Sequence, residues 1–309
     1  MIRFIINILI FLLIFINNTN ANKISIKFKV ENEIITSQDV NNELIYLRLL
    51  NNKLNNLDKK NQEQIAVNSL IQEKIKFIEL QNYFDFSIKD DQMEKLINKT
   101  LKNNLKLKNK NLNDYFRQNN LDYEDIKFKI KNEILWNKLI YDKYKSRINI
   151  NDKDLKKKLN NLVAKRESIK EYNISEILFD INDNENVNYK YETIINSINN
   201  DGFKNTANIY SISSSSKLGG QIGWVKKTQL SEKIQNIITN LKIGEISKPI
   251  QSGPGFLIIR LENIRDIQAD IDLEREFKNL RDYEIDRQLN QYSIYYFNRI
   301  KKNIFVDEL

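Results

Sequence analysis

The 309-residue sequence contains no cysteine and no histidine. Without cysteine, the fold has no disulfide bond, no thiolate nucleophile and no metal site with cysteine ligands. Without histidine, it also lacks the commonest general base and the commonest metal ligand. The composition therefore excludes many classes of enzyme, and we expect neither a metal ion nor a cofactor.

Glycine and proline are almost as scarce, with seven and two residues respectively. All nine lie between Gly202 and Gly255, and three of the glycines fall within the stretch "KLGGQIGWV" at 217–225. Glycine tolerates positive φ angles and the close approach of another backbone. The concentration of both residue types predicts that this window contains tight turns that the rest of the chain does not need.

Charge and hydrophobic content set broad limits on the class of protein. The net charge is +8, but the 49 basic residues are scattered rather than gathered in one block, so we expect no nucleic-acid binding. Hydrophobic residues make up 41% of the chain, which is enough to build the cores of two ordinary domains. The sequence is therefore that of a folded protein.

The first residues have the pattern of an export signal. After Arg3 comes the apolar run "FIINILIFLLIFI", which is short for a membrane-spanning helix of about 20 residues. Polar residues and Thr19-Asn20-Ala21 follow, and a small residue such as Ala21 is typical of a signal-peptidase site. We predict cleavage near Ala21 and no stable membrane insertion afterwards; an uncleaved anchor is the alternative.

The stretch from about 37 to 160 has neither glycine nor proline, and its apolar residues recur at helical spacing, as in Val67, Ile71 and Ile75. Polar segments that begin at Thr36, Asp122 and Asn151 have the residues of helix N-caps. Before them, "ISIKFKVENEIIT" alternates apolar and polar residues on both sides of a short break. This region is therefore predicted to be helical and preceded by a β-hairpin.

The pattern changes near residue 171. "YNISEILFDI" and "FLIIRLENI" are typical of strands, and 188–200 and 229–241 of helices, which predicts a small α+β domain. The serine run at 213–216 has no neighbouring base and is expected to be a flexible loop. After Arg265 the helical pattern returns, and glycine and proline are absent again. We infer that the C-terminal tail packs on the first region and that the α+β domain is an insertion.

Three motifs in this insertion carry a resemblance. "LGGQIGWV", "LKIGEISKPI" and "SGPGFLIIRLENIR", in this order, resemble the parvulin (PpiC, or rotamase) family of peptidyl-prolyl cis-trans isomerases. With the signal segment, "VENEIITSQDV" and the returning helix, the whole chain resembles SurA-type periplasmic chaperones with a single parvulin domain. The fold expected is multidomain, α and α+β: a signal peptide at 1–21, a helical chaperone domain at 22–170, a parvulin-like domain at 171–265, and a C-terminal helix and strand at 266–309 that complete the helical domain.

The resemblance also indicates where an isomerase site would lie. Parvulins have histidine in the first and last strands and aspartate or cysteine before the glycine pair; the matching residues here are Glu176, Leu257 and Ser213. No catalytic set is thus intact, which implies weak or absent isomerase activity. The alternative is an active isomerase whose apolar pocket suffices. The candidates for binding peptide in that pocket are Val225, Leu230, Ile234 and Phe256.

The partners that the resemblance implies are unfolded polypeptides. We expect the protein to act in the periplasm on unfolded outer-membrane or secreted proteins, with outer-membrane β-barrel precursors as the main clients. An anchored assembly factor, related to the membrane-anchored parvulin foldases, is the alternative if the N-terminal segment is retained.

Overall fold

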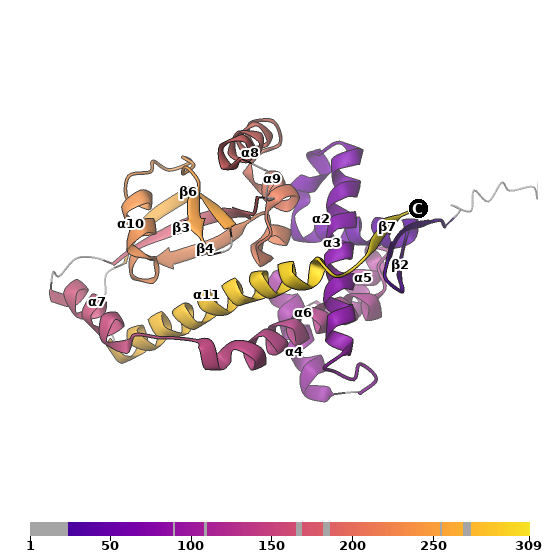
Figure 1. The fold of residues 1–309 in the computed structure, drawn as a ribbon, viewed down its shortest axis with the longest axis horizontal. Helices are drawn as coiled ribbons and strands as arrows, with labels where there is room; N and C mark the ends of the chain where they lie inside the picture. The colour runs from indigo at the N-terminus through magenta and orange to yellow at the C-terminus, as the bar shows by residue number, and fades with distance from the viewer. Residues whose placement is uncertain are drawn as a thin grey trace, which may run out of the picture.

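The fold is known from a computed structural model, which describes residues 24–88, 90–107, 110–164, 169–181, 186–253, 255–267 and 273–309. The predicted signal peptide and its cleavage point near Ala21 lie outside these residues. In Figure 1 the chain forms two bodies, and the long C-terminal helix α11 runs along both. One body is the helical domain, and the other is the segment from β3 to β6, which we call the insert.

The helical domain begins with the predicted hairpin, β1 (Ile26–Val30) and β2 (Glu33–Thr36), which pair in antiparallel fashion. Strand β7 (Val306–Glu308) pairs with the other edge of β1 and gives the order β2-β1-β7. The two ends of the described chain therefore meet in one small sheet (Figure 1). Residues almost 280 positions apart are thus parts of one structural unit.

Six helices of this domain precede the insert, among the residues that the structure describes. They begin where the capping residues predict: Thr36 forms a capping box with Asp39, and the Asp122 carboxylate accepts from the backbone N–H of Glu124. The helices are α2 (Ser37–Leu50), α3 (Lys59–Gln81), α4 (Asp91–Asn104), α5 (Leu112–Gln118), α6 (Tyr123–Tyr144) and α7 (Asp152–Ala164). Two short 3-10 helices, Asn52–Asn56 and Lys145–Arg147, lie between them.

Helix α11 (Leu273–Lys301) packs against α3, α6 and α7. The ring of Tyr292 stacks on Tyr144 with their centroids 4.5 Å apart, and Trp136 lies 5.7 Å from Tyr296. The indole N–H of Trp136 donates to Ser293 at 2.8 Å. These contacts bury aromatic area and satisfy the indole donor. The prediction that the tail completes the first domain is confirmed.

The insert contains a four-stranded antiparallel sheet in the order β4-β3-β6-β5. The strands are β3 (Ile169–Phe179), β4 (Gln221–Lys226), β5 (Ile250–Ser252) and β6 (Gly255–Ile267), and the helices are α8 (Val187–Asp201), α9 (Phe203–Tyr210) and α10 (Glu232–Ile238). Helix α9 is not predicted by the sequence pattern, and α10 is shorter than the predicted 229–241. The expected fold class, a helical domain with an α+β insertion, is confirmed.

The two faces of this sheet pack against different parts of the protein. On one face, Ile177, Phe179 and Ile258 form a buried cluster with residues of α8 and α9. On the other, Leu257 and Ile259 belong to a cluster that includes Leu230 and Ile238 from the segment around α10 and Ile294 of α11. The second face of the insert sheet therefore packs toward helix α11 of the helical domain.

The remaining predictions about organisation have different outcomes. The exact domain boundaries stay predictions, because the sheet and helix bounds do not by themselves delimit domains. Among the described residues, none of the helices is both long and apolar enough to cross a bilayer.

Candidate functional site

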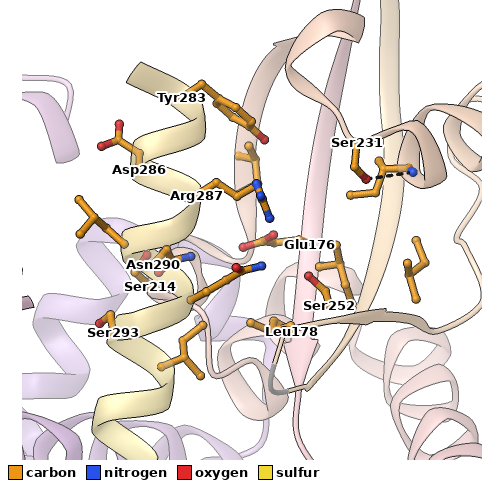
Figure 2. A pocket seen from close by; sticks show the side chains of 18 of the residues that line it. Glu176, Leu178, Ser214, Ser231, Ser252, Tyr283, Asp286, Arg287, Asn290 and Ser293 are labelled. Atoms are coloured by element: carbon orange, nitrogen blue, oxygen red, sulfur yellow. Dashed lines mark hydrogen bonds between the residues drawn. The ribbon is translucent and has the colours of Figure 1, made fainter. Parts of the chain in front are cut away.

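A cavity of about 740 Å³ lies between the second face of the insert sheet and helix α11. Figure 2 shows side chains of α11 facing those of β3 and the α10 region across it. The insert contributes aliphatic residues and about as many polar ones, and α11 contributes Tyr283, Asp286, Arg287 and Asn290 among others. The apolar wall consists of Ile174, Leu178, Ile222, Leu230, Ile234, Ile250, Leu257 and Ile259. A site of this size and lining suits a short segment of polypeptide.

The structure brings only some of the predicted peptide-binding residues to this cavity. Leu230 and Ile234 line it, as does Leu257, which had been considered only as an altered catalytic position. Val225 is buried in the same cluster, but its side chain does not line the cavity. The prediction for Val225 as a wall residue therefore does not fit the structure.

Phe256 is also placed elsewhere. Adjacent residues of a strand point to opposite faces, so Phe256 lies opposite Leu257. Its ring stacks on Phe179 at 5.8 Å within the cluster beneath α8 and α9. We expect Phe256 from the sequence to contact a peptide beside Leu230. The alternation of side chains along β6 instead places it on the other face of the sheet.

Glu176 lies on β3, an interior strand, and lines the cavity. Its Oε1 atom accepts hydrogen bonds from the hydroxyls of Ser213 at 2.6 Å and Ser215 at 3.0 Å. Ser213 caps a 3-10 helix at Ser214–Leu218, and both bonded serines are buried. The expected flexible serine loop is instead a helical turn, whose hydroxyls satisfy the carboxylate.

The glycines explain how this turn can lie against β3. Gly219 has a φ of +70° and ends the 3-10 helix in the left-handed region. Gly220 has a φ of +76°, and a Cβ atom there would stand 2.2 Å from the carbonyl oxygen of Glu176. The backbone N–H of Glu176 also donates to the Gly220 carbonyl at 2.8 Å. The glycine pair is thus needed to seat the serine turn beside Glu176.

The electrostatics of the cavity follow from burial. Burial raises the pKa of Glu176 above its ordinary value, and the hydrogen bonds from Ser213 and Ser215 offset this only in part. Burial also raises the pKa of Tyr283 on the opposite wall, with the charge of Glu176 adding to the shift. Arg287 is paired within α11, where its Nε donates to Glu284 at 2.9 Å. The cavity therefore holds a carboxyl group whose neutral form is favoured by its surroundings.

Across the described ranges of the chain, acidic side chains do not gather in the groups of three or more that hold a metal ion. The Glu176 carboxyl accepts from two serine hydroxyls, and the cationic side chains of Lys233 and Arg287 also line the cavity.

Comparison with known proteins assigns the insert. A family model described as "Rotamase: PPIC-type PPIASE domain" matches residues 174–263, which include Glu176, the serine turn and Leu257. The chain carries a PPIC-type parvulin domain. This PPIC-type domain provides one wall of the cavity, and α11, outside the matched residues, provides the other.

The similarity to curated proteins extends beyond the PPIC-type domain. Chaperone SurA of Idiomarina loihiensis is 22% identical over 214 residues, which are 67% of this chain and 49% of that protein. Chaperone SurA of Ralstonia nicotianae is 35% identical over 75 residues, which are 24% of this chain and 15% of that protein. The chain is thus similar in sequence to SurA chaperones, and its matches span about half or less of the length of these relatives.

Among solved structures, one described as belonging to the SurA-like chaperones PEB4 and Cj1289 of Campylobacter jejuni covers 92% of this chain and 99% of its own. The sequence identity is 16% and the TM-score 0.37. PrsA, a peptidylprolyl isomerase of Bacillus anthracis, covers 78% of this chain and 99% of its own, with 22% identity and a TM-score of 0.32.

Sequence reasoning missed three parts of the site. Ser215 is a second donor to Glu176, and the repeated serines were the only signal for it. Ile222 lies three residues from the buried Val225, so strand period alone would place the two on opposite faces, and no sequence signal pointed to Ile222 as a lining residue. The α11 wall gives no such signal, because it lies more than 100 residues away from Glu176 in sequence.

Proposed function

We propose that the protein is a periplasmic chaperone that holds segments of unfolded exported polypeptides, and that its PPIC-type domain has weak or no isomerase activity. The observation that carries this proposal is the apolar cavity shared by the PPIC-type domain and α11. An extended segment that enters it removes apolar area from water on two sides. Outer-membrane β-barrel precursors are the proposed clients, and the signal-like N-terminal segment supports export.

The proposed weak isomerase activity follows from the side chains that line the cavity. Leu230 and Ile234 can bury a prolyl ring, and Leu257 adds a further aliphatic surface. Isomerisation is accelerated only by groups that bind the twisted amide more tightly than the planar one. A wall of aliphatic side chains binds both forms alike, and the carboxyl of Glu176 accepts from two serines rather than donating to a substrate.

An active isomerase is the second candidate. Raising the pKa of Glu176 favours its protonated form, and a protonated carboxyl can donate a hydrogen bond to a twisted amide. This candidate predicts turnover that falls as pH rises and Glu176 ionises.

One experiment separates the two candidates. Purified protein lacking residues 1–21 is added at increasing substoichiometric amounts to a prolyl peptide, whose slow cis-to-trans phase takes tens of seconds or longer without catalyst. The same preparation is then tested for suppressing aggregation of an unfolded β-barrel precursor. The proposal expects an unchanged rate constant and suppression at roughly stoichiometric protein. A rate constant that rises in proportion to protein favours the active isomerase.

The cavity itself is tested with a matched pair of variants. Ile234→Glu places a charge on the wall, and we expect it to abolish most of the aggregation suppression. Asn236→Glu adds the same charge to the exposed face of α10 and is expected to leave suppression intact. Equal suppression by both variants would show that clients bind elsewhere.

A further inference from the structure

A second, smaller cavity of about 220 Å³ adjoins the first. The two share lining residues at their boundary: Lys76, Trp136, Asn137, Ser214, Asn290, Ser293 and Ile294. Along α11, the lining continues from Tyr283 in the first cavity to Lys301 in the second. At 1.5 Å per helical residue, this wall is about 27 Å long, which matches roughly eight residues of extended chain.

Lys76, on α3, lies where the two cavities meet. Its Nζ atom is 5.3 Å from the ring centroid of Trp136 and 5.9 Å from that of Phe297. Within the part of the chain that the structure describes, the ammonium group forms neither a hydrogen bond nor an ion pair. Aromatic faces stabilise the cation partly, but an ammonium group in such a setting gains most from a carboxylate.

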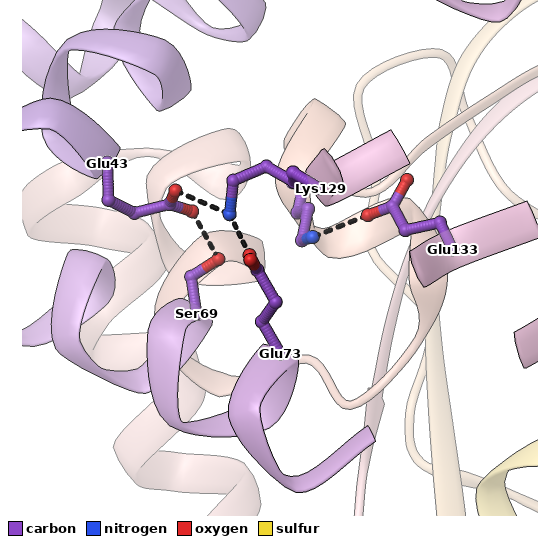
Figure 3. Close-up of polar contacts among 6 residues, drawn as sticks. Glu43, Ser69, Glu73, Lys129 and Glu133 are labelled. Atoms are coloured by element: carbon purple, nitrogen blue, oxygen red, sulfur yellow. Dashed lines mark hydrogen bonds and ion pairs between the residues drawn. The ribbon is translucent and has the colours of Figure 1, made fainter. Parts of the chain in front are cut away.

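The two carboxylates whose charges act on Lys76, Glu73 and Glu133, are already engaged. Figure 3 shows Glu73 bound to Lys129, and Lys217 donates to Glu133 at 2.6 Å. Burial lowers the pKa of Lys76 to about 8, and the charge of Lys217 adds to this, whereas Glu133 and Glu73 oppose it. The ammonium form therefore still predominates at neutral pH, without a bonded counter-ion.

We propose that Lys76 binds the carboxylate of an aspartate or glutamate side chain in a polypeptide segment that runs through both cavities. This inference rests on the proposed function and names the class of segment preferred: apolar, with one acidic residue near its middle. The position of Lys76 at the boundary favours a side-chain carboxylate, because a chain terminus would have to stop halfway along the wall.

The test measures binding of labelled eight- to ten-residue peptides to the purified protein. A neutral parent contains aliphatic residues, one proline and one glutamine, and its C-terminus is amidated. Glutamate replaces glutamine at each internal position in turn. For the best position we expect affinity about 10-fold above that of the matched glutamine peptide, since a hydrogen bond between two charged groups is stronger than one to a neutral amide.

Variants assign this preference to one residue. Lys76→Met, close in length but uncharged, is expected to bind glutamate and glutamine peptides alike, and Lys76→Arg to retain the preference. Lys138→Met is the matched control, because Lys138 is an exposed residue of α6 paired with Asp142. A glutamate preference that survives in Lys76→Met overturns the inference.

A second measurement needs no variant. In the unaltered protein, the glutamate preference should decline between pH 7 and pH 10 as Lys76 loses its proton. A preference that is constant over this range overturns the inference, as does one seen only for a peptide with a free C-terminal carboxylate. Failure of every peptide to bind overturns the proposed function as well, whereas equal binding of acidic and neutral peptides overturns this inference alone.

Discussion

Glu43 in the helical domain and Glu176 in the PPIC-type domain both lie largely withdrawn from solvent, and these two carboxyl groups are satisfied by different means. In the helical domain, Lys129 pairs with Glu43 at 2.7 Å and also with Glu73, and Ser69 donates to Glu43 (Figure 3). In the PPIC-type domain, Glu176 has only the hydroxyls of two serines.

The two arrangements have opposite effects on protonation. Burial disfavours the charged form of Lys129, but the two carboxylates outweigh it and raise its pKa. Glu176 has no cation bonded to it among the described residues, so burial prevails and its pKa rises instead. The charged groups of Glu43, Glu73 and Lys129 therefore connect three helices. The carboxyl of Glu176, by contrast, lies at the edge of a cavity and can change its protonation state.

The largest expected effect comes from the helical cluster. Lys129→Met leaves Glu43 and Glu73 buried without a cation, and breaking a buried pair in this way costs about 3–5 kcal/mol. Denaturant unfolding should show this loss in the free energy of unfolding. Lys138→Met removes an exposed pair and should cost less than about 1 kcal/mol. Equal losses in the two variants would mean that the buried cluster is not held by its charges.

An intermediate effect is expected in the serine turn. Ser215→Ala removes one of the two donors to Glu176 and should destabilise the protein by about 0.5–1.5 kcal/mol, because Ser213 still donates to the same oxygen. The neighbouring Ser216→Ala provides the control and should change stability by less than about 0.5 kcal/mol. The measurement is the free energy of unfolding by denaturant, followed by circular dichroism. No loss in Ser215→Ala would argue against the hydrogen-bonded turn.

The smallest effect is a dependence on pH. Because the pKa of Glu176 is higher in the folded protein than its ordinary value of 4.5, the folded state holds this proton to higher pH than the unfolded chain does. The contribution of Glu176 to the free energy of unfolding should therefore be fully present below pH 4.5. It should be lost as the pH rises through the raised pKa of the folded state.

Glu176→Gln should remove this part of the pH dependence while keeping an oxygen that accepts from a serine. The measurement is the difference in the free energy of unfolding between wild type and variant across a pH series. Glu192→Gln, on the exposed side of α8, is the control and should leave the profile unchanged. A Glu176→Gln difference that is constant with pH would contradict the comparison of the two clusters.

Several elements of the fold follow directly from local patterns. The alternation before Thr36 predicts the hairpin, and Thr36 and Asp122 predict where two helices begin, because both signals act between residues close in sequence. The three glycine motifs indicate the PPIC-type domain, since tight turns need those residues. Helix α9 is not predicted from the sequence, because it is short and follows a glycine.

The site was predictable only in part. Glu176, Ser213 and Leu257 were found through the resemblance, and Leu230 and Ile234 do lie on the cavity wall. Phe256 was misplaced, because a motif read along the strand does not say which face each residue takes. Whether the PPIC-type domain turns over substrate stays a prediction.

By itself, the sequence determined most of the helices, the hairpin, the inserted α+β domain and the absence of histidine chemistry. These depend on residue types and on spacings of a few residues. Only the tertiary structure decided that α11 closes a cavity over the PPIC-type domain, that two serines satisfy Glu176, and that Lys76, at a cavity boundary, has no ion-pair partner among the described residues. Such contacts join residues more than 30 positions apart, and their geometry is set by how helices and sheet pack around shared apolar surface.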